Sequence, residues 1–138
     1  METSRGKLTD RPWRALQLAT GLASAQNHVL VTPTVALAGV AAEGECLAAK
    51  ALASAGITPA AIVETTRKLP DRSGEPEWGP SLCAVVDAAD RISGDLGLPY
   101  TDAEHLTLAL LAEASVSSVV VRLGADLDAL RSAVHALV

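Results

Sequence analysis

The sequence predicts an all-α fold of eight helices, arranged as two four-helix units. The pattern of residues 8–69 recurs in residues 78–137, about seventy positions later, and such a period is typical of a duplicated helical unit. The chain is 49% hydrophobic but only 2% aromatic, with no Phe at all. Ala, Leu and Val supply the apolar mass, which favours close-packed helices over a β-sandwich. At 138 residues, one compact domain is expected.

The two copies correspond in a defined register. In the front half of each unit the separation is seventy residues, as in the pairs Leu8 and Trp78, Leu16 and Val86, Ala19 and Ala89, Leu22 and Ile92, and Val40 and Leu110. In the back half the separation is sixty-eight, so that Gly56 corresponds to Gly124. The second copy is therefore two residues shorter than the first. The difference falls after the position of Ala41 in the first copy and before Val116 in the second.

Helix-start and helix-stop signals divide the first unit, residues 8–69. Thr9 or Asp10 can cap a helix over residues 11–25, with Pro12 in its first turn. The buried stripe predicted for this helix is Ala15, Leu18, Ala19 and Leu22.

Three further helices follow in this unit. Thr32 and Pro33 begin a central helix that is apolar all round over residues 35–40. A third helix over residues 45–55 stops at Gly56, and Thr58 and Pro59 begin a fourth that runs to about Leu69.

A polar linker over residues 70–77 separates the units, and residues 1–7 are expected to be a flexible N-terminus. In the second unit, residues 78–138, helices are predicted over residues 80–96, 102–113, 115–123 and 126 to the end. Thr101 and Glu104 are predicted to form a capping box, with the Thr101 hydroxyl accepting the Glu104 amide and the carboxylate reaching back.

Composition argues against several classes of function. The net charge of −5, with no cluster of Lys or Arg, argues against nucleic acid as a partner. Cys46 and Cys83 lack metal-ligand spacing and are expected to be small buried hydrophobes within helices. We predict no metal and no cofactor. Without a long apolar run or a signal peptide, a cytoplasmic location is expected, with no membrane partner.

Four segments have a pattern seen in a known family: Leu8-Thr9-Asp10-Arg11, Trp78-Gly79-Pro80, the run from Leu96 to Leu106 (LGLPYTDAEHL), and the run from Val121 to Leu127 (VRLGADL). They resemble the Clp amino-terminal domain, the double Clp repeat that precedes the ATPase rings of Clp unfoldases. The second repeat matches well and the first is degenerate. The resemblance implies an all-α body with a pseudo-twofold axis that recruits substrates or adaptors and has no enzymatic activity. The chain has no nucleotide-binding loop, which suggests a stand-alone recognition module.

The resemblance also implies site residues. In some members a glutamate of each repeat helps to hold phosphoarginine-marked proteins; here the second-repeat glutamate is Glu104, beside His105, while Thr34 and Val35 stand at the first-repeat positions. In related domains, the aromatic residues that begin each repeat help to form a groove for cyclic peptide antibiotics. The corresponding residues here are Leu8 and Trp78. Half of the phosphoarginine site is therefore expected to be lost, and only one groove aromatic is retained.

Structural alternatives stand beside each of these roles. Glu104 can cap a helix and His105 can pack, rather than contact a ligand, and Trp78 is either a staple between repeats or an exposed anchor. The leading prediction is a non-enzymatic peptide- or protein-binding module in Clp-dependent proteolysis, acting with Clp unfoldase or protease components or their substrates. The rival prediction is a small helical transcriptional or anti-toxin-type regulator.

Overall fold

The computed structural model describes residues 5–70 and 75–138, and these form eight helices and two very short strands. In chain order the elements are α1 (Asp10–Ala25), β1 (Leu30–Val31), α2 (Pro33–Glu43), α3 (Leu47–Ser54), α4 (Pro59–Glu64), β2 (Glu77–Trp78), α5 (Pro80–Asp95), α6 (Ala103–Ala112), α7 (Ala114–Arg122) and α8 (Leu127–His135). The all-α prediction of two four-helix repeats is confirmed.

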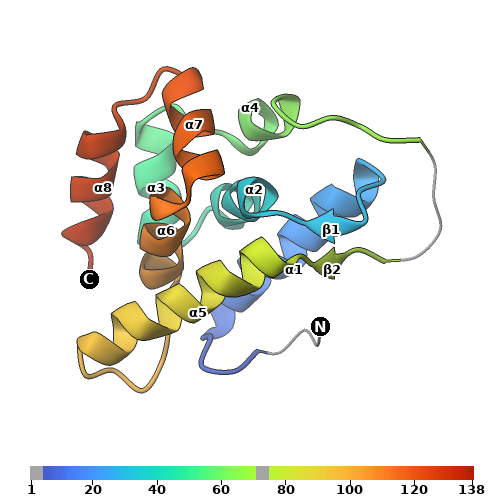
Figure 1. Ribbon diagram of the computed structural model, residues 1–138. Coiled ribbons are helices and arrows are strands. Elements are labelled where there is room, and N and C mark those ends of the chain that lie inside the picture. Colours follow the sequence, from blue (N-terminus) through green and yellow to red (C-terminus); the bar gives the residue numbers. More distant parts are fainter. Residues whose placement is uncertain (1–4, 71–74) are drawn as a thin grey trace.

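Helix α2 occupies the centre of the molecule, and the other helices surround it (Figure 1). Its sequence is apolar on every side, so it has no face suited to water. The closest approach is to α1, at Gly39. A Cβ atom at this position would lie 2.1 Å from the Ala15 carbonyl oxygen and 2.8 Å from the Ala19 Cβ. The absence of a side chain at Gly39 is therefore what lets α1 and α2 touch through their backbones.

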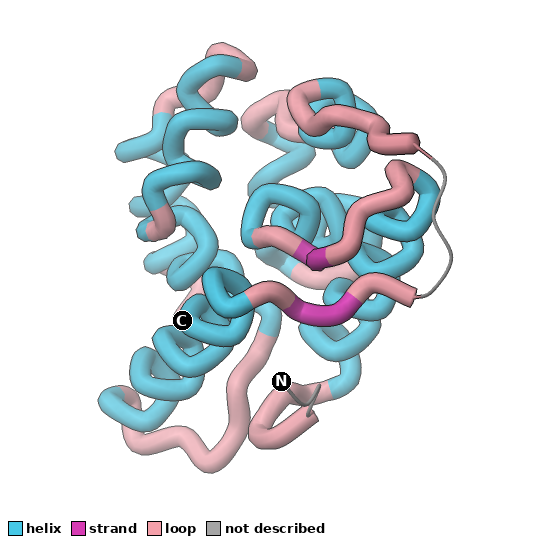
Figure 2. The backbone as a smooth tube through the Cα atoms, turned by 45° about the vertical axis from the view of Figure 1, so that its right-hand side comes forward, coloured by secondary structure: helices cyan, strands magenta, loops and turns pink. Residues whose placement is uncertain are grey.

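The two repeats are joined by an exchange of extended segments. Strand β2, which opens the second repeat, pairs in parallel with β1 of the first, Trp78 opposite Val31 (Figure 2). Leu8, which opens the first repeat, forms a parallel bridge with Thr101 of the second. The Gly79 amide donates to the Val31 carbonyl at 3.2 Å, and the Thr9 amide donates to the Thr101 carbonyl at 3.0 Å. Each hydrogen bond becomes the other when the copies are exchanged, as a pseudo-twofold axis requires.

The buried positions repeat with the same register. Five residues of α1 are buried, Pro12, Ala15, Leu16, Ala19 and Ala23, and their counterparts seventy residues later are the buried residues of α5, namely Leu82, Val85, Val86, Ala89 and Ser93. The predicted stripe on the first helix differs at two positions, because Leu18 and Leu22 are only half-buried, and Leu16 takes the fully buried place.

Helix α4 ends at Glu64, five residues before the predicted end. The Thr65 and Thr66 hydroxyls donate to the carbonyls of Ile62 and Val63, at 2.6 and 2.7 Å. Such side-chain bonds compete with continuation of a helix. The Leu69 amide then donates to the Gln26 carbonyl at 2.9 Å, so this end of the segment is held against the loop after α1.

The segments predicted as linker and N-terminus are partly described. Residues 71–74 and 1–4 lie outside the described residues. Glu77, assigned to the linker from the sequence, belongs to β2. Lys7, assigned to the flexible N-terminus, accepts the Thr101 amide on its carbonyl at 2.9 Å and donates from Nζ to the Ser93 hydroxyl at 3.2 Å.

Within the described parts of the chain, no single helix is long and apolar enough to cross a membrane. Helices α6 and α7 meet that criterion only when they are taken together, and they are bent by 87° at the break between them.

A glutamate at the corresponding position of each repeat accepts backbone amides near the start of the next helix. Glu43 ends α2, and its Oε1 accepts the amides of Glu45 and Cys46 at 3.0 and 2.7 Å. Its counterpart Glu113 follows α6, and its Oε2 accepts the amides of Ser115 and Val116 at 2.8 and 3.3 Å. Burial opposes ionisation of Glu43, but the hydrogen bonds from Cys46 and Glu45 and the Arg11 charge outweigh it, and the pKa is lowered.

A first prediction concerns the contact at Gly39. Gly39→Ala should lower the free energy of unfolding by about 1–3 kcal/mol, because the new methyl group overlaps the α1 backbone. Gly21→Ala is the matched control: this helical glycine has open space around it, so alanine should raise the free energy of unfolding by about 0.5–1 kcal/mol. Urea unfolding measures both, and equal effects of the two substitutions would contradict the close approach of α1 and α2.

A second prediction uses Glu43. Because its pKa is lowered in the folded state, the carboxylate stabilises the protein above its ordinary pKa of 4.5, and this contribution is lost as the pH falls through the lowered value. Glu43→Gln should therefore cost about 1–2 kcal/mol near neutral pH.

The difference between wild type and Glu43→Gln should shrink in acid, as urea unfolding at neutral and acidic pH would show. Glu113→Gln is the control; its half-exposed carboxylate should give a smaller loss, about 0.5 kcal/mol. A loss at Glu43 that does not change with pH would argue against an ionised carboxylate there.

Candidate functional site

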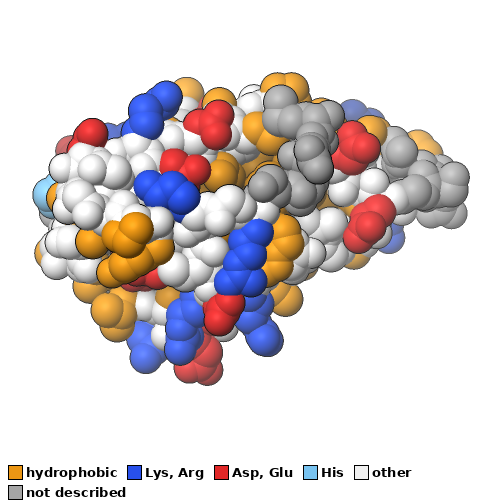
Figure 3. All heavy atoms as spheres, turned by 90° about the horizontal axis from the view of Figure 1, so that it is seen from below, with side chains coloured by type: hydrophobic (Ala, Val, Ile, Leu, Met, Phe, Trp, Pro, Cys, Tyr) orange, Lys and Arg blue, Asp and Glu red, His pale blue; other side chains and the backbone are white. Residues whose placement is uncertain are grey.

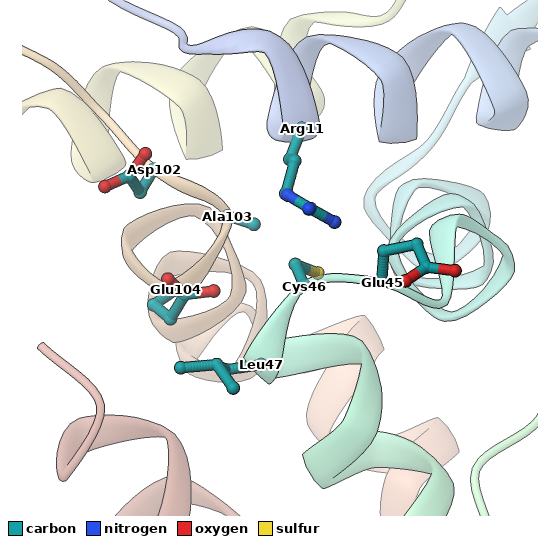
Figure 4. Close-up of a pocket in the computed structure, with 7 residues that line it drawn as sticks. All are labelled: Arg11, Glu45, Cys46, Leu47, Asp102, Ala103 and Glu104. Carbon is teal, nitrogen blue, oxygen red and sulfur yellow. The ribbon is translucent and has the colours of Figure 1, made fainter.

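A pocket of about 320 Å³ opens where α1, the start of α3 and the start of α6 meet (Figure 4). It is lined by Arg11, Glu45, Cys46, Leu47, Asp102, Ala103 and Glu104. Both repeats contribute to it, since α1 and α3 belong to the first and α6 to the second. The Arg11 side chain lies between Glu104 on one side and Glu45 on the other.

The pocket forms in the connection where the first repeat is two residues longer than the second. In the second repeat Glu113 alone separates α6 from α7, whereas Gly44, Glu45 and Cys46 separate α2 from α3. Gly44 ends α2 with φ of 74°, a left-handed conformation that glycine adopts without a steric penalty. Cys46, the last residue of the longer connection, and Leu47, the first residue of α3, form one wall of the pocket.

Glu104 lies in the first turn of α6 and is half-buried. Its Oε2 accepts the Ala48 amide, at the start of α3, at 3.4 Å. None of the ion pairs among the described residues includes Glu104. Burial raises its pKa, with a further contribution from Asp102, and the Ala48 amide and Arg11 only partly offset this. The pocket therefore contains a carboxylate whose charge is incompletely compensated.

The predicted capping box was wrong by one residue. Asp102, not Thr101, is the N-cap of α6, and the Asp102 amide donates to Nδ1 of His105 at 2.9 Å. Thr101 is fully buried, and its hydroxyl donates to the Asp90 carboxylate at 2.7 Å. This bond and the bridge to Leu8 draw Thr101 into the core. Glu104 is thereby left to face the pocket rather than to cap its own helix.

His105 is buried and does not line the pocket. Its side chain is committed to the Asp102 amide, and burial lowers the pKa of the imidazole, against the opposing effect of the Asp102 charge. The structure thus separates Glu104 and His105: one faces the pocket, and the other packs into the core.

A second hollow of about 500 Å³ adjoins the pocket on the side of α1. It is lined by Asp10, Arg11, Arg14, Glu43 and Glu45, so that Arg11 and Glu45 belong to both. The Arg11 Nη1 lies 3.4 Å from Oε2 of Glu43, while 55% of the Arg11 side chain remains exposed. Arg11 can therefore meet a ligand without losing contact with Glu43.

Cys46 is buried, as predicted, but it is the N-cap of α3 rather than a helical residue. Its Sγ accepts the Ala49 amide at 3.3 Å. Burial raises the pKa of the thiol to about 11, and the Glu43 and Glu104 carboxylates add to the shift. At neutral pH the thiol stays protonated, which makes it a poor nucleophile.

The other residues predicted for ligand contact lie elsewhere. Leu8 and Trp78 are 4% and 6% exposed and open the two exchanged segments. Trp78 also packs edge-to-face against Trp13, with ring centroids 6.0 Å apart. Thr34, in the first turn of α2, is half-buried. Among the predicted residues, only Glu104 lines the pocket.

Among the lining residues, Arg11, Cys46 and Leu47 were not predicted from the sequence. The available signal was the two-residue difference between the copies, which marks the longer connection before Leu47. On the face of the molecule shown in Figure 3, basic and acidic side chains lie interspersed.

Comparison with known proteins identifies the family. The family model of the Clp repeat (R) N-terminal domain matches residues 7–116. Chaperone protein ClpB of Oceanobacillus iheyensis is 30% identical over 135 residues, which is 94% of this chain and 17% of that protein. The ATP-binding subunit ClpC of the Clp protease of Staphylococcus aureus is 31% identical over 127 residues, 89% of this chain and 15% of that protein. The chain thus spans about one-sixth of the length of these relatives.

Solved structures show the same fold. The N-terminal domain of ClpD from Arabidopsis thaliana superposes with a TM-score of 0.80 at 21% identity, covering 98% of this chain and 96% of that one. The ClpV N-domain in complex with a VipB peptide gives a TM-score of 0.68 at 21% identity, covering 91% of this chain and 82% of that one. The family model accounts for most of the chain, and both repeats have the architecture of these domains. The chain belongs to the Clp repeat (R) N-terminal domain family.

Proposed function

We propose that this chain is a non-catalytic binding module that recruits proteins or peptides to a Clp-type unfoldase. Support comes from membership of the family, and from the solved relative whose N-domain holds a VipB peptide. The single observation that carries the proposal is the pocket between the repeats, which presents Glu104 as a half-buried carboxylate with no ion-pair partner among the described residues.

The chemistry of the pocket suits recognition rather than catalysis. A nucleophilic mechanism needs an activated nucleophile with a base in reach. The Cys46 thiol has a pKa of about 11, and the buried His105 is engaged with the Asp102 amide. These groups hold the walls of the pocket in place, and Glu104 and Arg11 remain to meet a ligand.

Phosphoarginine is the ligand class that fits this pair of charges. Its guanidinium would face the Glu104 carboxylate, in the geometry that favours paired hydrogen bonds, and its phosphoryl group would face Arg11 and the start of α3. At the pseudo-symmetric junction, the first repeat has Thr34 at the position of Glu104, and the second repeat has Ser81 at the position of Arg11. We therefore propose one such site in the chain instead of two.

Cyclic peptide antibiotics are the other ligand class suggested by the family resemblance. Their expected groove involves Leu8 and Trp78, which are buried and fix the exchanged segments. A ligand there would have to displace packed side chains. We therefore place the principal ligand site at Glu104 and assign Leu8 and Trp78 to packing.

Titration calorimetry tests the proposal with a peptide that contains phosphoarginine and the same peptide with unmodified arginine. The phosphorylated peptide should bind with a stoichiometry of one, and Glu104→Gln should weaken it about tenfold or more, since a charge-assisted pair is lost. Thr34→Ala, at the corresponding position of the first repeat, is the matched control and should leave the affinity unchanged. Equal affinities of wild type and Glu104→Gln would refute the assignment.

Stability separates a ligand role of Glu104 from a structural one. Because its pKa is raised in the folded state, the ionised carboxylate opposes folding, and stability falls as the pH rises through that pKa. Glu104→Gln should remove this dependence and should unfold at an equal or higher urea concentration near neutral pH. A variant that loses both binding and stability would indicate that Glu104 supports the fold.

A further inference from the structure

A second groove, away from the Glu104 pocket, lies between α6 and α8. It has a volume of about 450 Å³ and is lined by Leu108, Ala112, Arg131, Ser132, His135 and Ala136. Leu108 and Ala112 come from the middle and end of α6, whereas Glu104 is at its start. The groove is thus separate from the proposed site, although both use α6.

The floor of the groove is apolar, and at Leu108 it is more exposed than the corresponding position of α2 in the first repeat. Helix α6 has the same all-round apolar character as α2, its counterpart. Ala38 of α2 is fully buried, but Leu108, seventy residues later, is a larger side chain that is only half-buried. A leucine on an uncovered face of a helix offers apolar area that a partner can bury.

The wall of the groove carries positive charge in an acidic protein. Arg131 and His135 stand one helical turn apart on α8, and none of the six lining residues is acidic. The chain as a whole has a formal charge of −5. The Arg131 guanidinium therefore gives this groove a positive charge with no acidic residue in its lining, and it complements a carboxylate.

Arg131 is already held in position for such a contact. Its Nη2 donates to the Leu111 carbonyl at 2.9 Å and to the Ser117 hydroxyl at 3.3 Å, which holds the guanidinium against the end of α6 and the first turn of α7. Its Nη1 faces Asp128 at 4.0 Å, and that carboxylate is 96% exposed. An exposed pair of this length is weak, so an incoming carboxylate can replace Asp128 at little cost.

We propose that the α6–α8 groove is a docking site for a partner protein segment with apolar side chains flanked by carboxylates. The apolar side chains cover Leu108 and Ala112, and a carboxylate meets Arg131 and His135. The site goes beyond recruitment at Glu104, since it gives the chain a second contact surface of opposite charge preference.

The test is an NMR titration of the whole chain with two short blocked peptides, acetyl-Glu-Leu-Leu-Glu-amide and acetyl-Lys-Leu-Leu-Lys-amide. The acidic peptide should give saturable amide shifts at Leu108, Ala112 and Ser132, and should bind at least about fivefold more tightly than the basic one. Raising the salt concentration should weaken it. Equal binding of the two peptides, or shifts confined to the Glu104 pocket, would overturn the proposal while leaving the Glu104 site intact.

Substitutions locate the contact. Ala112→Glu places a carboxylate in the groove and should weaken the acidic peptide about tenfold. Ala42→Glu is the matched control, because Ala42 is exposed at the corresponding position of α2 and lies outside the groove. His135→Glu, on an exposed side chain, places a carboxylate at the other wall of the groove should Ala112→Glu fail to fold. Equal losses with Ala42→Glu and Ala112→Glu would also refute the site.

Discussion

The exchange of extended segments between the repeats is the constraint on which the rest of the structure depends. Trp78 of the second repeat pairs with Val31 of the first, and Leu8 of the first pairs with Thr101 of the second. Each segment leads directly into the first helix of its own repeat, so the pairing fixes where α1 and α5 begin relative to the opposite copy. The buried faces of both helices then follow the same register.

The Glu104 pocket is a consequence of this interlocking and of one asymmetry within it. The exchange brings the starts of α1 and α6 together, because Thr9 and Thr101 are hydrogen-bonded and the Thr9 hydroxyl donates to Asp102 at 2.7 Å. A perfectly symmetric molecule would have two equivalent junctions. The two additional residues before α3, and Thr34 at the position that corresponds to Glu104, make the junctions differ.

Local sequence signals predicted the helices. The features that were not predicted depend on contacts between residues that are distant in the sequence. Thr32 and Thr58 accept amides at helix starts as expected, because capping depends on neighbouring residues alone. Asp126, predicted only as the first residue of the last helix, is the N-cap of α8. The strands were not predicted, since two residues carry no periodic pattern and their partners are distant in sequence. Thr101 failed as a cap because its hydroxyl donates to Asp90. Glu104 was predicted as a ligand contact from a family resemblance, which did not predict the pocket around it.

The exchanged pairing has a consequence for how such a molecule can arise. In a chain with only one repeat, the opening segment would have no partner, because it pairs with a segment of the other repeat. The repeat's own pairing segment would also have no partner. Two identical copies would satisfy each other through a twofold axis, with each contact made twice, as in an isologous homodimer. Joining two such copies in one chain preserves every contact and removes the requirement that both halves stay identical. The two copies can then have different residues at equivalent positions, as they do at Glu104 and Thr34, whereas the two subunits of a homodimer cannot.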